Sequence, residues 1–459
     1  MSSAISKSKS SPFARKIQPV QEIAVVILAA GKGTRMKSRT PKVLHKIAGL
    51  PMISHIVKSA ESLKPKKIIV VLSDGMDDVA KTVAPHEIAI QKMQKGTGDA
   101  LKAAMAHLKD FKGQILVLFG DVPLISADTL KMVVEHHRKG KGFGATVLAF
   151  AAPDPKGYGR IFQNPDGTLA RIVEDADASE DEKLVRLCNS GTMLLEGDGL
   201  DDALAQIKNK NAQGEFYLVD LPKILSDDGL PTGVIRGDFH ELKGVNSRAQ
   251  LAEVEMIWQH RKRLAMMDDG VTLQDPNTVY FAHDTKVGRD TVIGANCVFG
   301  EGVEIEDNVE IRSFSHLEGA CVKSGAVIGP FARLRPGSDI GEDARIGNFV
   351  EIKNSKIGKG AKANHLGYIG DAELGDNSNF GCGAITVNYD GLKKSKTIIG
   401  KNVMVGSNSS LIAPITIADG AYIAAGSTLT KDVAADDLVI GRAKTIVMAG
   451  KAKGRMKSG

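Results

Sequence analysis

A glycine-rich loop near the start of the chain has the residue types of a phosphate-binding site. Residues 29–35 read AAGKGTR and follow the apolar, β-branched run Ile23–Leu28. The two glycines let the backbone turn tightly and approach a ligand, while the loop's lysine and arginine, with Lys42, surround it with positive charge. The spacing matches neither the dinucleotide fingerprint nor the Walker A loop, so an ordinary glycine turn stays open as the alternative.

A carboxylate and a second glycine loop follow two further stretches of the same kind. Gly120-Asp121 closes the apolar run Leu116–Phe119, and residues 91–97 end in Gly96-Thr97, where a helix is expected to begin. An aspartate beside a tight turn could hold Mg²⁺ on a polyphosphate, because that ion needs only one or two protein oxygens. A turn or helix-capping aspartate is the alternative.

His365 is the residue of the second half best suited to proton transfer. Histidine changes protonation near neutral pH, although a lone histidine is more often structural. It lies shortly before residues 384–396, a polar and basic stretch with Asn388 and Tyr389. We expect this whole stretch to be extruded as a loop, and insertions into repeat folds usually map to a binding face.

The elements that position these residues differ between the two halves. From about Thr285 to Thr430 an apolar residue returns every sixth position, a period that fits neither a helix nor an ordinary strand. It predicts a hexapeptide parallel β-helix, in which each step is a short strand and a corner and three steps make one triangular coil. Gly, Asn, Asp and Ala are expected at the corners. The inward residues are Val322, Ile328, Leu334, Ile340, Ile346 and Ile352, then Ile399, Val405, Leu411, Ile417, Ile423 and Leu429.

The first half alternates apolar strands with helical stretches, which predicts a doubly wound α/β sheet. Ligands in such sheets bind at the carboxyl ends of strands, where the two glycine loops and Asp121 fall. The predicted strands are 23–28, 68–72, 115–119 and 146–150, and the predicted helices are 53–62, 98–108 and 126–138.

A longer helix is expected to connect the halves. Residues 249–267 place Leu251, Val254, Trp258 and Leu264 on one side, and the cluster Arg261-Lys262-Arg263 reads as a solvated face.

Composition limits the classes of function. The 459 residues are too many for one core, and the net charge of +6 permits acidic small substrates without requiring nucleic acid. No apolar run is long enough to span a bilayer. The cysteines, Cys188, Cys297, Cys321 and Cys382, form no metal motif and suggest a reducing cytoplasm. The Ser- and Lys-rich start of the chain has no apolar core of a signal peptide and is expected to be disordered, with a transit-like segment as the alternative.

The motif LAAGKGTRM at residues 28–36, followed by PKVL at 41–44, resembles the signature of sugar-nucleotide pyrophosphorylases. Joined to a hexapeptide β-helix, it is similar to the bifunctional family of uridyltransferases and acetyltransferases that makes UDP-N-acetylglucosamine for cell-wall and lipopolysaccharide synthesis. The resemblance covers residues 22–445 and implies a left-handed β-helix, Mg²⁺, the co-substrates UTP and acetyl-CoA, and a cytoplasmic homotrimer that binds neither nucleic acid nor membrane.

For uridylyl transfer, the resemblance implies Arg35 and Lys42 as catalytic residues and Asp121 with Asn246 as metal ligands. The implied contacts to UTP and the UDP-sugar are Leu28, Ala29, Ala30, Gly31, Lys32, Gln91, Gly96, Thr97, Gly120, Asp121, Gly159, Glu174, Asn189 and Asn246. Val219 stands where a threonine is expected, so a hydroxyl contact is missing there.

For acetyl transfer, the resemblance implies His365 as the base, with Glu351 as its orienting partner. The implied sugar-phosphate contacts are Arg335, Lys353, Tyr368 and Asn379, and those to acetyl-CoA are Asn388, Tyr389, Ser407, Ala425 and Arg442. Direct attack by the amine is expected, and an acyl intermediate on Cys382 is the rival.

Two other readings of the whole chain stay open: a pyrophosphorylase whose β-helix is regulatory, and a scaffold with degenerate sites. The expected divisions are a tail over 1–20, a uridylyltransferase domain over 21–248, a linker helix over 249–268, an acetyltransferase β-helix over 269–447 and a tail over 448–459.

Overall fold

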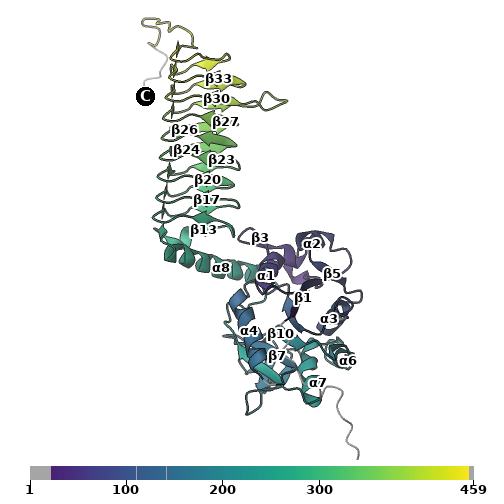
Figure 1. The fold of residues 1–459 in the computed structure, drawn as a ribbon. Coiled ribbons are helices and arrows are strands. Elements are labelled where there is room, and N and C mark those ends of the chain that lie inside the picture. The colour runs from purple at the N-terminus through teal and green to yellow at the C-terminus, as the bar shows by residue number, and fades with distance from the viewer. Residues whose placement is uncertain (1–21, 110, 141, 454–459) are drawn as a thin grey trace, which may run out of the picture. The chain divides into compact units, whose positions relative to one another are not determined.

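The computed structural model describes residues 22–109, 111–140 and 142–453, so the predicted tail over 1–20 lies outside the described residues. The chain divides into two compact units between Trp258 and Gln259. The first is a sheet covered by helices, and the second is a stack of short strands (Figure 1). No described helix has the length and hydropathy needed to cross a membrane.

The first unit is built on a mixed sheet that contains four adjacent parallel strands. Its order is β11 (Thr232–Arg236), β7 (Ala145–Ala151), β10 (Leu187–Glu196), β6 (Gln114–Phe119), β1 (Ile23–Leu28), β4 (Lys67–Leu72) and β5 (Glu87–Ile90). Off this path, β8 (Arg160–Gln163) pairs with β10, and β9 (Leu169–Val173) pairs with β8. The four predicted strands are confirmed. β10 runs antiparallel to both β6 and β7, which the alternation of elements did not predict.

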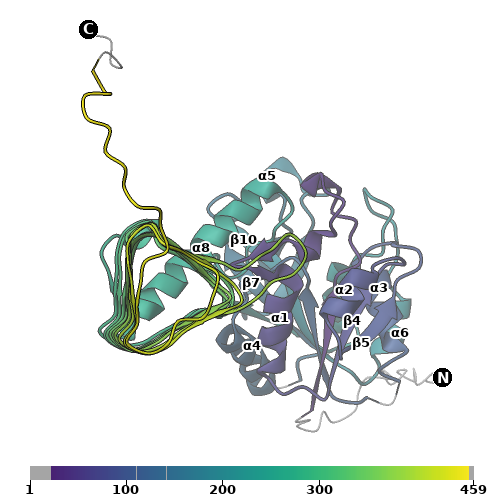
Figure 2. The same cartoon turned by 90° about the horizontal axis from the view of Figure 1, so that it is seen from above.

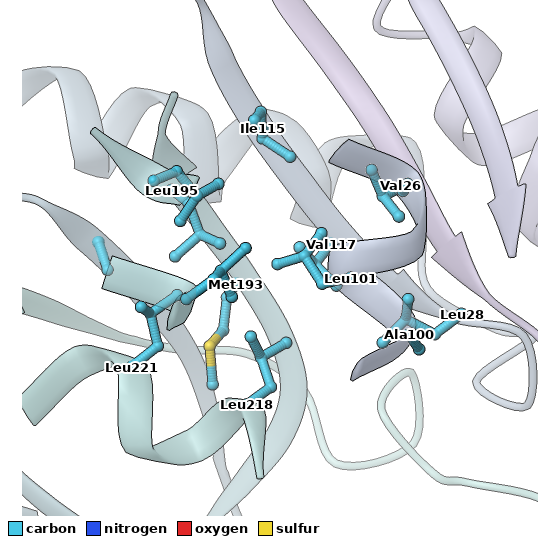
Figure 3. Packing of buried hydrophobic residues seen from close by; sticks show 14 of the residues in the cluster. Val26, Leu28, Ala100, Leu101, Ile115, Val117, Met193, Leu195, Leu218 and Leu221 are labelled. Atoms are coloured by element: carbon cyan, nitrogen blue, oxygen red, sulfur yellow. The ribbon is translucent and has the colours of Figure 1, made fainter. Parts of the chain in front are cut away.

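Helices cover both faces of this sheet because successive strand residues point to opposite sides. One core joins the strands to α3 (Thr97–Met105), α6 (Leu200–Ala205) and α7 (Leu221–Asp227). In it Val26 and Val117 lie in the same cluster as Leu101 and Leu218 (Figure 3). The other core joins them to α1 (Met52–Glu61), α2 (Asp77–Thr82) and α4 (Ala127–Lys139). The sheet is therefore doubly wound, as predicted.

The second unit is a parallel β-helix that has a triangular outline when viewed along its axis (Figure 2). Its strands run from β12 (Thr272–Leu273) to β36 (Leu438–Val439), and most are two or three residues long. Two are longer, β24 (Arg345–Lys353) and β26 (Lys362–Gly370), because each turns a corner without losing its pairing. All twelve apolar positions of the six-residue series are buried.

The insert is shorter than predicted. Ala384 and Thr386 are buried in the coil, and β29 (Ile385–Val387) pairs with its neighbours on both sides. The prediction that all of residues 384–396 leave the coil is therefore wrong for its first part. Thr386 fills an inward position because its hydroxyl pairs with the amide and carbonyl groups of Gly370. The extruded loop begins at Tyr389 and projects beside β30 (Thr397–Ile399) in Figure 1.

Side chains of helix α8 (Arg248–Asp268) make the hydrogen bonds to the first coil that a neighbouring strand would otherwise make. The Gln259 amide accepts from the Phe281 N–H at 2.9 Å and donates to the Phe281 carbonyl at 2.7 Å. A terminal coil has no neighbour on one side, so its backbone groups need such partners.

The basic cluster of α8 is not the solvated face that the sequence suggested. Arg263 is buried and donates to the carbonyls of Pro276 and Val279, and Lys262 donates to the Thr285 carbonyl. Burial lowers the pKa of Lys262 against the raising effect of nearby aspartates. The prediction that Leu264 lies on the same side of the helix as Val254 is also wrong, because Leu264 is exposed while Val254 is fully buried.

One corner of the β-helix departs from the small and polar residues expected there. Phe314, Phe331, Phe349 and Leu366 occupy the left-handed region, with φ of 61°, 55°, 56° and 38°. Their side chains are 45–60% exposed, and the phenylalanine rings stack at centroid distances of 4.9 Å and 5.3 Å. We call these four residues the aromatic corner. Holding bulky residues at positive φ costs about 1–2 kcal/mol each, so such positions mark sites worth a functional explanation.

Leu411→Ala should lower the free energy of unfolding of the β-helix by about 2–5 kcal/mol, because it removes buried methyl groups from a coil that cannot collapse onto them. Leu392→Ala is the matched control, since Leu392 is 95% exposed in the extruded loop and its loss should cost less than about 0.5 kcal/mol. Unfolding in denaturant, followed by circular dichroism, measures both. Equal shifts would contradict the assignment of inward and outward positions.

Candidate active sites

The glycine-rich loop that is predicted to bind phosphate is shaped by one glycine in a left-handed turn. After β1 the chain forms a short 3₁₀ turn, Thr34–Met36, which Gly33 begins at φ 60°. A Cβ at Gly33 would lie 2.6 Å from Cβ of Lys42, so the close approach of Lys42 to the loop requires glycine. Lys32 and Arg35 are exposed at the edge of the loop.

The loop forms one wall of a cavity of 470 Å³ at the carboxyl ends of β1, β5 and β6. Gln94 closes it by donating to the Ala30 carbonyl at 3.0 Å, and Gln91 is held by the Gly96 carbonyl and the Asp99 carboxylate. Of the residues predicted to bind the nucleotide, this cavity is lined by Leu28, Ala29, Ala30, Gly31, Lys32, Lys42, Gln91, Gly96, Thr97 and Asp121.

Gly120 does not line that cavity. Its N–H donates to the Leu28 carbonyl at 2.9 Å, and a Cβ there would lie 3.0 Å from Cβ of Ala29. It therefore supports the loop from behind.

A second cavity, of 490 Å³, adjoins the first. Both are lined by Thr97, Phe119, Asp121 and Glu215, so the two form one continuous site. The second holds the residues predicted for the sugar side, namely Arg35, Gly159, Glu174, Asn189 and Asn246, and Val219 also lines it. A Cβ at Gly159 would lie 3.2 Å from Oε1 of Glu174, so glycine there keeps this carboxyl accessible to the cavity.

Burial and neighbouring acids raise the pKa of two groups that line the second cavity, Glu174 and Tyr217. Burial raises the pKa of Glu174, and the charges of Asp177, Asp175 and Asp220 raise it further. Burial raises the pKa of Tyr217 to about 12, and the charges of nearby acids contribute, namely Asp177, Glu174, Glu215 and Asp220. The raised pKa of Glu174 favours its protonated form, which can donate as well as accept a hydrogen bond.

Asp121 and Asn246 converge although 124 residues separate them in the sequence. The Val245 N–H donates to the Asp121 carbonyl at 2.8 Å, which brings the two side chains to one point. There the Lys42 ammonium lies 2.5 Å from Oδ2 of Asp121 and 3.0 Å from Oδ1 of Asn246. Two oxygens that meet on one cation form a donor set that suits Mg²⁺.

In the β-helix, His365 is exposed at a corner of β26. Its Nδ1 lies 3.0 Å from Oδ1 of Asn348 on the preceding coil. Because an amide oxygen only accepts, this contact selects the tautomer with hydrogen on Nδ1 and leaves a lone pair on Nε2. The expectation that Glu351 orients His365 is wrong. The Glu351 carboxylate accepts from Arg335 at 2.8 Å, and on β24 it is Asn348, three residues before Glu351, that pairs with His365.

A second polar cluster lies beside Tyr368 on the same strand. The Asn388 amide donates to Oδ2 of Asp371 at 2.5 Å and lies 3.5 Å from the Tyr368 hydroxyl. Lys353 is 3.8 Å from the same Asp371 oxygen. A Cβ at residue 370 would collide with the Tyr368 ring, so Gly370 makes room for it. The structure thus gathers three of the residues predicted for acetyl transfer, namely Lys353, Tyr368 and Asn388.

The residues predicted to bind acetyl-CoA continue along one corner of later coils. The Ser407 carbonyl accepts from the Gly426 N–H, and the Arg442 guanidinium donates to the Ala425 carbonyl. Ser407, Ala425 and Arg442 are exposed, as is Tyr389 at the start of the extruded loop. Asn379 stands apart on β28 (Asn379–Phe380), where its amide contacts Sδ of Met404.

Sequence reasoning missed several residues that the fold brings into these sites. Asn348 and Asp371 belong to the β-helix, and Phe119, Gln94 and Glu215 line the nucleotide cavity. Asn348 precedes His365 by 17 residues, so a search at one coil's spacing would have found it. Glu215 gave no signal, because its loop is placed by the pairing of Phe216 with Lys95 and Gly98.

Comparison with known families gives two matches. Residues 25–186 match the MobA-like NTP transferase domain, and residues 284–319 and 396–431 match the bacterial transferase hexapeptide repeats. The second unit is therefore a left-handed parallel β-helix of hexapeptide repeats.

Curated relatives span nearly the whole chain. A bifunctional protein GlmU from Zymomonas mobilis is 47% identical over 92% of this chain and 94% of its own length, and one from Roseobacter denitrificans is 48% identical over 94% and 95%. One from Staphylococcus haemolyticus is 42% identical over 93% of this chain and 99% of its own length. Identity of this extent, carried through both units, means that the chain belongs to the GlmU family of bifunctional transferases, which acetylate glucosamine-1-phosphate and join N-acetylglucosamine-1-phosphate to UTP to form UDP-N-acetylglucosamine.

Proposed function

We propose that the two reactions take place at the two sites described above. Uridylyl transfer belongs to the paired cavities of the first unit, and acetyl transfer belongs to the corner of His365 in the second. The observation that carries this division is the convergence of Lys42, Asp121 and Asn246 in one unit and of Lys353, Tyr368 and Asn388 in the other. In this scheme residues 21–248 and 269–447 are the two catalytic domains, and residues 249–268 are the linker helix.

In the first site UTP would lie across the 470 Å³ cavity, with its base toward Gln91 and Thr97 and its phosphates on the glycine loop. The sugar phosphate is already a nucleophile, so the protein must align it with the α-phosphate and stabilise the developing charge. Arg35 and Lys42 supply fixed positive charge for this. Asp121 and Asn246 would hold Mg²⁺, which when bound neutralises phosphate charge.

Asp121→Ala should abolish formation of UDP-N-acetylglucosamine, because it removes both a metal ligand and the carboxylate that holds Lys42. Acetyl transfer should remain near the wild-type rate, since its residues belong to the other unit. Separate assays of the two products on the purified variant measure this. Equal loss of both activities in a folded variant would contradict the division of labour.

In the second site His365 would act as the general base. The amine of glucosamine-1-phosphate is mostly protonated at neutral pH, and only its free base can attack a thioester. With hydrogen on Nδ1 toward Asn348, Nε2 can take the amine proton as the amine attacks the acetyl carbonyl. The C–N bond forms, the C–S bond breaks, and coenzyme A leaves and takes up the proton as its free thiol. Arg335 and Lys353 would hold the phosphate. Ser407, Ala425 and Arg442 would follow the coenzyme along the corner.

His365→Ala should lower acetyl transfer by roughly 10² to 10⁴ and leave uridylyl transfer unchanged. Cys382→Ala is the control, because Cys382 is an exposed free thiol that an acyl-enzyme mechanism would use. Steady-state rates with varied acetyl-CoA distinguish the two mechanisms. Trapping acetyl on Cys382, or ping-pong kinetics that vanish with this thiol, would overturn direct transfer.

We further propose that the chain is a homotrimer assembled through the aromatic corner. Exposed stacked phenylalanines in a conformation that favours glycine or asparagine are costly in an isolated chain, and burial against a neighbouring subunit would offset that cost. The aromatic corner leads through Leu366 to His365, so the acetyl-CoA groove would lie between subunits. The four free cysteines and the substrates support a cytoplasmic location.

Phe331→Asn should weaken assembly without harming the monomer, because asparagine tolerates the positive φ of 55° while it removes apolar surface. Analytical ultracentrifugation should show a smaller species, and acetyl transfer should fall with it. Leu438→Asn, at a 66% exposed position on β36, is the matched control and should stay trimeric. If the Phe331→Asn variant sediments as an assembly of the same mass as the wild type, the aromatic corner is not the interface.

A further inference from the structure

Asp371 is a charged residue at the centre of the acetyltransferase cluster that none of the predicted roles includes. It follows β26 at a corner with φ of 48°, and 14% of its side chain is exposed. Its backbone is tied on both sides, since its N–H donates to the Lys353 carbonyl and its own carbonyl accepts from the Thr397 N–H. The carboxylate is thus held by the coils before and after it.

Both carboxylate oxygens of Asp371 are engaged by neighbouring side chains. Oδ1 accepts from the Asn354 amide at 2.6 Å. Oδ2 accepts from the Asn388 amide at 2.5 Å and lies 3.8 Å from the Lys353 ammonium. The Asp371 carboxylate therefore contacts both Lys353 of the preceding coil and Asn388, the residue just before the extruded loop.

The charges around Asp371 explain why a carboxylate is needed there. Burial opposes its ionisation, but the hydrogen bonds from Asn354 and Asn388 and the charges of Lys353 and Lys394 outweigh burial and lower its pKa. Lys394, from the extruded loop, approaches Lys353, whose ammonium lowers the pKa of Lys394. Two ammonium groups at one point repel each other, and Asp371 is the carboxylate that acts on both.

We propose that Asp371 is a positioning residue for acetyl transfer, which holds the Lys353 ammonium and the Asn388 amide in place for the phosphate and sugar of glucosamine-1-phosphate. This rests on the proposed function of the second unit. Asp371 is not itself a substrate contact, because its two oxygens already accept from protein groups and its negative charge would repel a phosphate. Its effect passes through Lys353 and Asn388.

The test is the kinetics of Asp371→Asn in the full chain, which keeps the shape of the side chain and removes its charge. The value of kcat/KM for glucosamine-1-phosphate should fall by about tenfold to a hundredfold, as expected for losing charged hydrogen bonds. The alkaline limb of its pH profile should also move to lower pH, because the charge of Asp371 raises the pKa of Lys394 beside this site, and without it Lys394 loses its proton more readily. Uridylyl transfer should be unchanged.

Asp376→Asn is the matched control. Asp376 is a carboxylate of the same β-helix that accepts from the Lys359 N–H at 2.9 Å and pairs with Lys401 at 2.9 Å, away from Tyr368 and Asn388. It should leave acetyl transfer unchanged. A similar fall in kcat/KM for Asp376→Asn would show that Asp371 only stabilises its coil. A fall in kcat/KM for Asp371→Asn without the shift of the alkaline limb of the pH profile would show the same.

Lys353→Met separates this inference from the proposed function. If Lys353→Met is impaired while Asp371→Asn is not, the phosphate site stands and the positioning role of Asp371 is overturned. If Lys353→Met behaves like the wild type, the proposed phosphate site is wrong, and the positioning role fails with it.

Discussion

The second unit depends on one constraint: a strand of two residues cannot satisfy its own backbone, so each coil needs the next. From β12 to β36 the N–H and carbonyl groups of one coil pair with those of the next, at a spacing of 17 or 18 residues in most coils and 25 across the insert. The six-residue apolar series fills the space that the coils enclose. The first coil lacks a neighbour on one side. Gln259 and Arg263 of α8 supply the missing donors and acceptor, which explains why polar residues are buried in that helix.

The same constraint decides where chemistry can occur in the β-helix. Inward positions are filled and corners are tightly stacked, so the side chains proposed for acetyl transfer stand on outward positions and on the loop that leaves the coil. Stacking places residues from successive coils side by side at a fixed spacing. Asn348 meets His365 in this way, and Lys353 meets Asp371. A rigid stack thus aligns groups that need not be near in sequence.

The first unit solves the positioning problem with a sheet instead of a stack. Parallel strands bring their carboxyl ends to one edge, where the glycine loop, the Gln91–Thr97 loop and Asp121 surround a cavity. Long-range backbone pairing then adds what the strands do not carry, because the hydrogen bond from Val245 to Asp121 delivers Asn246 to the same point. Membership of the GlmU family, with both units matched, leaves neither a purely regulatory β-helix nor a degenerate scaffold as an interpretation of the chain.

The sequence by itself determined the two folds and most of the lining of the 470 Å³ cavity. A six-residue period and β-branched runs act locally, through which side chains can be buried, so Ile346, Val405 and strand β1 were predictable from their neighbours alone. The glycine loop and Asp121 followed because strand ends are visible in the sequence. Tertiary structure alone decided the pairings. In the folded chain Glu351 is bound to Arg335 and not to His365. Arg263 is buried against carbonyls of the first coil, and Ala384 and Thr386 stay inside the β-helix. These outcomes depend on the length of each coil, which is 17 or 18 residues in most and 25 across the insert, and on backbone groups left unpaired at an open end. No short stretch of sequence specifies either.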